Sequence, residues 1–207
     1  MRQVPALQSI HQPLTVSILP ALPHSADVAN AAHQSGHEVM LHMPMEAVDP
    51  KAPRERRIIL TGMPKDEVLQ TMDQMIQTVP FVVGMNNHQG SKATADPQLM
   101  QIVLGEVKRR GLFFVDSVTG RSICAAAAKR QKVRFGERAV FLDNNDNPDE
   151  IRRQVMRLRA LASSNGRAIA IGHDRPNTLK VLQQVLPELE KSGCRIVHAS
   201  ELTSVPD

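Results

Sequence analysis

The chain has 207 residues, of which 42% are hydrophobic and 22% charged, a composition typical of a globular protein with one sizeable core. We therefore expect a single domain over residues 1–207. Two cysteines do not make a disulfide framework, and no apolar run approaches the roughly 18 residues of a membrane span. The N-terminus lacks the apolar core of a signal peptide, which leaves two alternatives: a cytosolic protein, or a chain that begins inside a longer one.

The formal net charge is +4, and the basic residues cluster at Lys108–Arg110, Lys129–Arg138 and Arg152–Arg159. Nucleic acid is one interpretation of such clusters. Solvent-exposed faces of helices are the better one, because the same segments also carry Asp and Glu. The chain has no Tyr or Trp and only five Phe, so surfaces on which bases stack are nearly absent. We expect no nucleic-acid partner.

Strand and helix patterns alternate through the first half of the chain. Short apolar runs rich in β-branched residues predict strands, and stripes of apolar residues at helical spacing predict helices. In chain order the pattern predicts a strand at Thr15–Leu19, a helix at Ser25–Ser35, a strand at Glu38–Met43, a surface loop at Ala47–Gly62, a helix at Lys65–Gln77 and a strand at Phe81–Gly84.

The second half repeats this alternation. Asp96-Pro97 and Asn147-Pro148 each place an N-cap before a proline at the first helical position. The predicted elements are a helix over 97–110, a strand at Leu112–Val115, a helix at Ser122–Lys132, a strand at Val140–Leu142, a helix at Asp149–Asn165, a strand at Ala168–Ile171, a helix at Asn177–Ser192 and a strand at Arg195–His198.

This alternation indicates an α/β fold whose parallel strands are joined by right-handed helical crossovers. Seven strands are visible, and either a barrel or a doubly wound sheet accommodates them. No GxGxxG or P-loop motif is present, which weakens the nucleotide-binding folds of the doubly wound class. We favour a parallel (β/α) barrel.

Four residues that suit metal chemistry follow predicted strands: His42, Glu46, His88 and His173. In a parallel barrel the carboxyl ends of all strands meet at one face. A lone histidine at a strand end is more often structural, but three with carboxylates are harder to dismiss. Two histidines and a carboxylate with an open position form a common hydrolytic metal site, and His42, Glu46 and His88 are its candidates. His173, far away in sequence, suits a general acid or base.

Four further polar residues stand at the same strand ends. Asn87 and Ser91 are candidate donors to a developing oxyanion, with turn formation as the alternative at even odds. Asp116 is a candidate to orient a metal-ligand histidine, or else it caps the turn at Ser117–Gly120. Asp143 more often marks a loop before a helix cap, but we place it with Ser91 among the candidate substrate-binding residues.

Five motifs resemble the divergent polysaccharide deacetylases, bacterial proteins distantly similar to the NodB-type deacetylases. They are HMPME at 42–46, NNHQGS at 86–91, FVDSVT at 114–119, FLDNN at 141–145 and IGHDRPNTL at 171–179, and they stand in family order. The likeness runs from about Leu14 to Leu202. It implies a distorted (β/α) barrel with a divalent metal, zinc by type, at its mouth.

The resemblance also implies roles for single residues. His42 matches the first histidine of the family's His-x-x-x-His motif, and Glu46 stands where the second would be. His88 lies in the Asn-His-x-Gly-Ser motif and is the better candidate for the second imidazole. His173 matches the histidine that protonates the leaving amine when acetyl is removed from an N-acetylated amino sugar. The implied partner is therefore a carbohydrate.

One departure from the family concerns its first strand, which carries an Asp-Asp-x-Gly motif with a metal carboxylate and the catalytic base. No Asp-Asp pair exists in this chain. Without that strand the barrel has an open edge and the metal lacks one ligand. We therefore keep two hypotheses, a deacetylase and a catalytically inactive envelope protein that binds glycan or a protein partner. The family is usually exported, which favours a periplasmic location, and the scarcity of aromatic residues leaves the substrate open.

Overall fold

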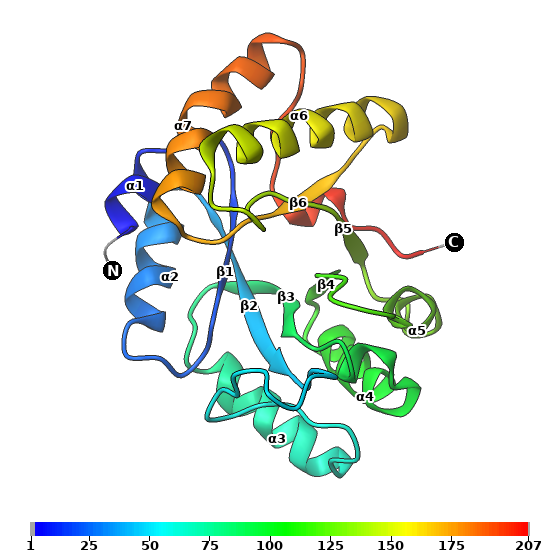
Figure 1. Cartoon of the computed structure of the whole chain (residues 1–207). Helices are drawn as coiled ribbons and strands as arrows, with labels where there is room; N and C mark the ends of the chain where they lie inside the picture. The colour runs from blue at the N-terminus through cyan, green and yellow to red at the C-terminus, as the bar shows by residue number, and fades with distance from the viewer. Residues whose placement is uncertain (1–2, 207) are drawn as a thin grey trace.

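The computed structural model describes residues 3–206, in which strands and helices alternate along almost the whole chain (Figure 1). The strands are β1 (Thr15–Ile18), β2 (Glu38–Met45), β3 (Val82–Gln89), β4 (Phe113–Asp116), β5 (Phe135–Phe141) and β6 (Ile169–Ile171). The helices are α1 (Val4–Gln8), α2 (Ser25–Gln34), α3 (Lys65–Ile76), α4 (Pro97–Arg109), α5 (Cys124–Gln131), α6 (Pro148–Asn165) and α7 (Pro176–Lys191), with two 3-10 helices, η1 (Ala93–Ala95) and η2 (Ala199–Leu202).

The six strands form one parallel sheet in the order in which they occur along the chain, from β1 to β6. A doubly wound sheet reverses its strand order, whereas a barrel continues in one direction. The sheet is curled and the helices lie around its outside (Figure 1). Within residues 3–206, β1 and β6 each pair with one strand only, so the fold is a half-barrel with an open edge. The predicted α/β barrel class is confirmed.

The side chains of β2 show how the sheet separates core from site. Val39, Leu41, Met43 and Met45 are buried in the large core cluster beneath the helices. Because side chains alternate along a strand, the intervening residues, His42 among them, point into the half-barrel. A second apolar cluster packs α6 and α7 against β5. The main core thus occupies the outer face of the sheet, while on the inner face Met40 of β2 packs with Phe113 and Val115 of β4 in a small apolar cluster, and His42 follows two residues further along β2.

Strand β3 continues to Gln89, five residues beyond the predicted end at Gly84. The polar run that follows Gly84 remains in the sheet because Asn86 pairs in register with His42 of β2. Position 84 requires a glycine, because a Cβ there would lie 2.3–2.6 Å from ring carbons of Phe113 and would clash with them. This close approach lets an aromatic ring of β4 lie across β3 beneath the polar site.

The predicted strand at Arg195–His198 is wrong. That segment is irregular and leads into η2, which crosses the amino ends of β1 and β2. The backbone N–H of Ala199 donates to the Thr15 hydroxyl (2.8 Å), and that of Ser200 donates to the Glu38 carboxylate (3.2 Å). Side chains at the start of β1 and β2 therefore satisfy the first backbone N–H groups of η2.

No helix within residues 3–206 combines the length and the apolar character that crossing a membrane requires.

Candidate active site

Two histidines meet at the carboxyl ends of β2 and β3. In the sheet register His42 stands beside Asn86, and Pro44 stands beside His88. The ring atom Nε2 of His42 lies 3.0 Å from Nδ1 of His88, and the two rings meet edge to face. The structure therefore brings together the two imidazoles that the sequence named as metal ligands.

The partner of His42 fixes its tautomer. Its Nδ1 lies 2.8 Å from Oδ1 of Asn86, and an amide oxygen only accepts hydrogen bonds, so Nδ1 carries the proton. The lone pair is then on Nε2, the atom that faces His88. Burial lowers the pKa of His42 to about 4, and the nearby His88 and His173 lower it too, while the Asn86 hydrogen bond opposes them. His42 is therefore a neutral imidazole at physiological pH.

Asn86, on β3, is held by one residue from β1 and one that directly follows β4. The Ser17 hydroxyl, on β1, donates to Oδ1 of Asn86, and Nδ2 of Asn86 donates to the Ser117 hydroxyl at 3.2 Å. The Ser117 hydroxyl in turn donates to the Asn87 carbonyl at 2.8 Å. Sequence reasoning missed Ser17, Asn86 and Ser117. The available signal was that each is a polar residue within or directly after an apolar strand.

His88 is the more accessible member of the pair. Its partial burial lowers the pKa of its ring, the charge of Glu55 raises it, and His173 lowers it again. In one neutral tautomer His88 donates its Nδ1 proton to Nε2 of His42, and in the other, with the proton on Nε2, its Nδ1 carries a lone pair. Glu55 belongs to the loop between β2 and α3, and sequence reasoning did not single it out.

His173 forms a second unit with Asp143. Asp143 is completely buried and follows β5, whereas the His173 side chain, after β6, is 56% exposed. Nδ1 of His173 lies 2.9 Å from Oδ1 of Asp143, and the Oδ2 atom accepts from the His173 backbone N–H (2.7 Å) and the Thr178 hydroxyl (2.8 Å). The hydrogen bond to Asp143 raises the pKa of His173 against the effect of burial. Burial tends to raise the pKa of Asp143, but these three hydrogen bonds lower it below its ordinary value.

The two units lie at the same end of the half-barrel. His173 lowers the pKa of both His42 and His88, so the three rings are close enough to interact electrostatically. The site therefore contains two imidazoles whose pKa is lowered and one whose pKa is raised. The sequence had placed Asp143 at a helix cap or near substrate; the structure makes it the partner of His173.

Glu46 is engaged elsewhere. Its Oε1 accepts from the Lys92 ammonium (2.8 Å), and its Oε2 accepts from the backbone N–H (2.8 Å) and the hydroxyl of Thr61. Burial tends to raise its pKa, but Lys92 and Thr61 lower the pKa of Glu46 to about 2. The carboxylate ties the loop after β2 to the segment after β3, so its contacts are structural ones.

Asn87, Ser91 and Asp116 likewise have partners of their own. The Asn87 side chain accepts from the Ser117 backbone N–H (2.9 Å) and donates to the Gln89 carbonyl (2.7 Å). The Ser91 hydroxyl accepts from the Val48 N–H at 3.0 Å. Asp116 accepts from the Val118 N–H (2.8 Å) and the Ser122 hydroxyl. The contacts of Asp116 are local and fit the cap alternative, whereas Asn87 and Ser91 contact residues 30 and 43 positions away and link separate segments of the chain.

The fit to a metal is partial. His42 and His88 are neutral and present Nε2 and Nδ1 to each other, which suits a divalent ion that prefers nitrogen ligands. Across residues 3–206, however, no cluster of three or more His, Cys, Asp or Glu side chains is arranged to hold a metal. The chain offers two ligands of a hydrolytic site, and a third is needed to complete it.

The family profile of the divergent polysaccharide deacetylases matches residues 1–203, and the chain belongs to this family. Among its relatives is the uncharacterized protein YibQ of Escherichia coli K12, which is 40% identical over 194 residues. That match covers 93% of this chain but 60% of YibQ. An uncharacterized protein of Haemophilus influenzae is 36% identical over 190 residues, covering 91% of this chain and 68% of its own length.

A crystal structure of an uncharacterized protein from Agrobacterium tumefaciens C58 superimposes with a TM-score of 0.93 at 21% identity. The superposition covers 98% of this chain and 83% of that one. At this identity the likeness concerns the fold alone, and it supports the half-barrel architecture described above.

Proposed function

We propose that the protein is a metal-dependent hydrolase that removes acetyl groups from N-acetylated amino sugars. The observation that carries the proposal is the pairing of opposite pKa shifts at one end of the half-barrel. The pKa values of His42 and His88 are lowered, which favours the neutral ring that a metal ligand needs, and the Asp143 hydrogen bond raises the pKa of His173, which favours the protonated ring that a proton donor needs. Membership of the deacetylase family supports it.

Each residue has a definite task in this proposal. His42 and His88 hold the ion through Nε2 and Nδ1, and Asn86 keeps the His42 ring in the tautomer that leaves Nε2 unprotonated. When bound, the ion supplies Lewis-acid activation of water and of the amide carbonyl. His173 keeps its Nδ1 on Asp143 and delivers the proton of Nε2 to the departing amine. Asp143 restores the charged state, because its carboxylate favours the protonated ring.

The proposal requires a third metal ligand. The family resemblance implies a carboxylate from an Asp-Asp-x-Gly strand, and the open edge between β1 and β6 is where a further parallel strand would complete the barrel. We therefore assign the activity to the whole protein in which that strand is present, and we place that protein in the periplasm.

A second function is favoured by a specific observation. Glu46, the carboxylate four residues after His42, is fully engaged by Thr61 and Lys92. If no other carboxylate completes the site, the protein is an inactive envelope protein that binds glycan or a protein partner.

Zinc content and acetate release separate the two functions. We expect the purified chain to bind zinc weakly, and His88→Ala to lose that zinc, while His24→Ala, an exposed histidine paired with Asp27, keeps it. The whole protein should bind zinc near one equivalent and release acetate from N-acetylglucosamine oligomers. Zinc binding without acetate release from any such oligomer would favour the inactive protein.

A further inference from the structure

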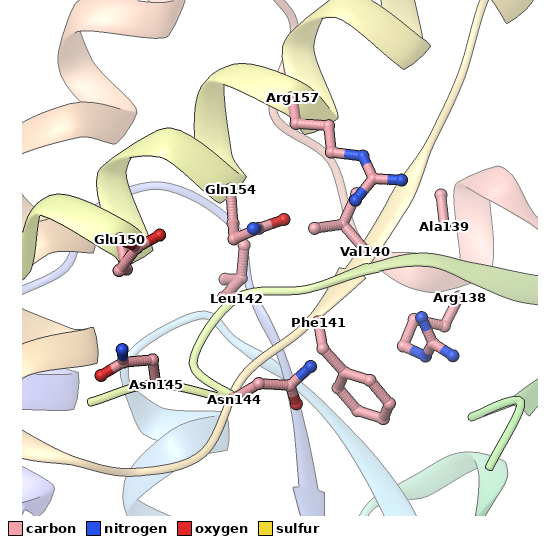
Figure 2. A pocket seen from close by; sticks show the side chains of 10 residues that line it. All are labelled: Arg138, Ala139, Val140, Phe141, Leu142, Asn144, Asn145, Glu150, Gln154 and Arg157. Atoms are coloured by element: carbon pink, nitrogen blue, oxygen red, sulfur yellow. The ribbon is translucent and has the colours of Figure 1, made fainter. Parts of the chain in front are cut away.

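A cleft of about 350 Å³ lies between β5 and α6, outside the histidine cluster (Figure 2). Its existence follows from the pairing of β5. That strand pairs with β4 as far as Glu137 and with β6 from Arg138 onward, because β4 ends at Asp116. Among the described residues, the second half of β5 therefore has no strand on its β4 side. A crevice opens where neighbouring strands separate, as it does at ligand sites of other α/β sheets.

The cleft has an excess of positive charge. Arg138 is fixed in place: its guanidinium donates to the carbonyls of Ser117 and Val118, each at 2.7 Å, and lies 3.9 Å from the ring centre of Phe141. Arg157 extends from α6 toward β5 (Figure 2).

The acidic residue of the cleft is already neutralised, because Glu150 forms an ion pair with Arg153 one turn along α6. Two arginines thus face the cleft without an opposing free carboxylate among its lining residues. An anionic group is the ligand that this arrangement favours.

The rest of the lining suits a sugar ring. Phe141 supplies an apolar ring, while Asn144, Asn145 and Gln154 supply amide donors and acceptors for hydroxyl groups (Figure 2). The volume is at the lower end of the range for ligand pockets, which limits the occupant to about one sugar unit.

The cleft also adjoins the proposed proton donor. Asn144 follows Asp143 directly, and Asp143 holds His173 through its carboxylate. A sugar in the cleft would therefore be connected through one loop to the group that protonates the leaving amine.

We propose that this cleft is a subsite for a carboxylate-bearing sugar that neighbours the N-acetylated sugar in the substrate. The substrate class is then an acidic, N-acetylated glycan, and the carboxylate binds between Arg157 and Arg138. This assignment rests on the proposed deacetylase function, whose substrate it specifies.

The test is calorimetric binding to the chain without added metal. The probes are a hyaluronan tetrasaccharide, which alternates glucuronic acid with N-acetylglucosamine, and the neutral chitin tetrasaccharide. We expect the hyaluronan probe to bind about tenfold more tightly, the size of one charge-assisted hydrogen bond. Arg157→Gln should remove that preference, and Arg159→Gln, an exposed arginine of the same helix outside the cleft, should keep it.

Three results would overturn the subsite: equal affinity for the two tetrasaccharides, equal effects of the two arginine variants, or equally tight binding of a tetra-aspartate peptide. The last would show that the cleft binds carboxylates without a sugar. Failure of the deacetylase proposal is distinguishable, because it shows as absent acetate release while the Arg157-dependent preference persists.

Discussion

The two histidine units at the carboxyl end of the half-barrel differ in the chemical group that faces Nδ1 of the ring. The Nδ1 of His42 faces a neutral amide oxygen, and the Nδ1 of His173 faces a carboxylate oxygen. Burial lowers the pKa of His42 to about 4 against the raising effect of its Asn86 hydrogen bond, whereas the Asp143 hydrogen bond raises the pKa of the more exposed His173 against burial. The difference shows that the depth of burial and the charge of the Nδ1 partner together decide the direction in which the pKa of each ring shifts.

The largest effect is expected from Asn86→Asp, which gives His42 the kind of partner that His173 has. A carboxylate there should raise the pKa of His42 by about 1–3 pH units, since the charged ring gains an opposite charge at hydrogen-bond distance. Proton NMR of the histidine rings against pH measures this. Asn30→Asp makes the same change at an exposed position of α2 and should leave His42 unaltered. An unchanged titration of His42 in Asn86→Asp would contradict the comparison.

Asp143→Asn makes the reverse exchange. It should bring the pKa of His173 below its ordinary value, because burial then acts without the opposing carboxylate. The free energy of unfolding should fall by about 1–3 kcal/mol, because Asp143 is buried and accepts three hydrogen bonds. Urea unfolding measures this loss. The control is Asp146→Asn, the same substitution at an exposed residue of the same loop. Equal stability of the two variants would show that the buried carboxylate contributes nothing.

The contributions of His42 and His173 to the free energy of unfolding should depend on pH in opposite directions. His173 has a raised pKa, so its contribution is present below pH 6.5 and is lost as the pH rises through its folded value. Asp143 has a lowered pKa, so its contribution is present above pH 3.8 and is lost as the pH falls through its folded value. His42 acts oppositely to His173, and its preference for the neutral ring costs stability as the pH falls from 6.5 to about 4.

His173→Gln should lose the stabilisation that His173 gives at low pH, so its free energy of unfolding should fall less than that of the parent protein as the pH rises above 6.5. The free energy of unfolding of His42→Gln should fall less than that of the parent protein as the pH drops from 6.5 to about 4. Urea unfolding at half-unit steps of pH gives the free energy of unfolding of each variant as a function of pH. The same pH dependence in both variants would contradict the opposite contributions of the two histidines. Since the His173 side chain is more than half exposed, solvent screening keeps its share small.

The smallest effect is expected from Ser17→Ala. It removes one of the two donors to the Asn86 oxygen and leaves the His42 contact in place, so we expect a loss of about 0.5–1.5 kcal/mol. Thermal unfolding measures it, with Ser35→Ala, whose hydroxyl donates to Ala31 within α2, as the control. A larger loss of unfolding free energy in Ser17→Ala than in Asp143→Asn would contradict the expectation that the buried Asp143 contributes more to stability.

The sequence predicted the parallel barrel because alternating strand and helix patterns leave few topologies. It also identified His42, His88 and His173, since ligand-type residues at strand ends are visible without coordinates. It missed Asn86 because a polar residue inside a strand was interpreted as the end of that strand. It also gave no sign that Lys92, 46 residues away, engages Glu46. Pairings between polar side chains distant in sequence leave no periodic pattern.

The segment after α7 has a consequence for how the protein acquires its fold during synthesis. Its residues 199–204 contact Thr15, Glu38 and Phe135, and 162 residues separate Ser200 from Glu38. At about 5–20 residues per second, the ribosome needs about 8–30 s to translate that interval. The residues at the amino ends of β1 and β2 are therefore translated this long before the residues of η2 that donate hydrogen bonds to them. Folding of this half-barrel therefore finishes only after residues 199–204 have been translated, and its late contacts are the most distant in sequence.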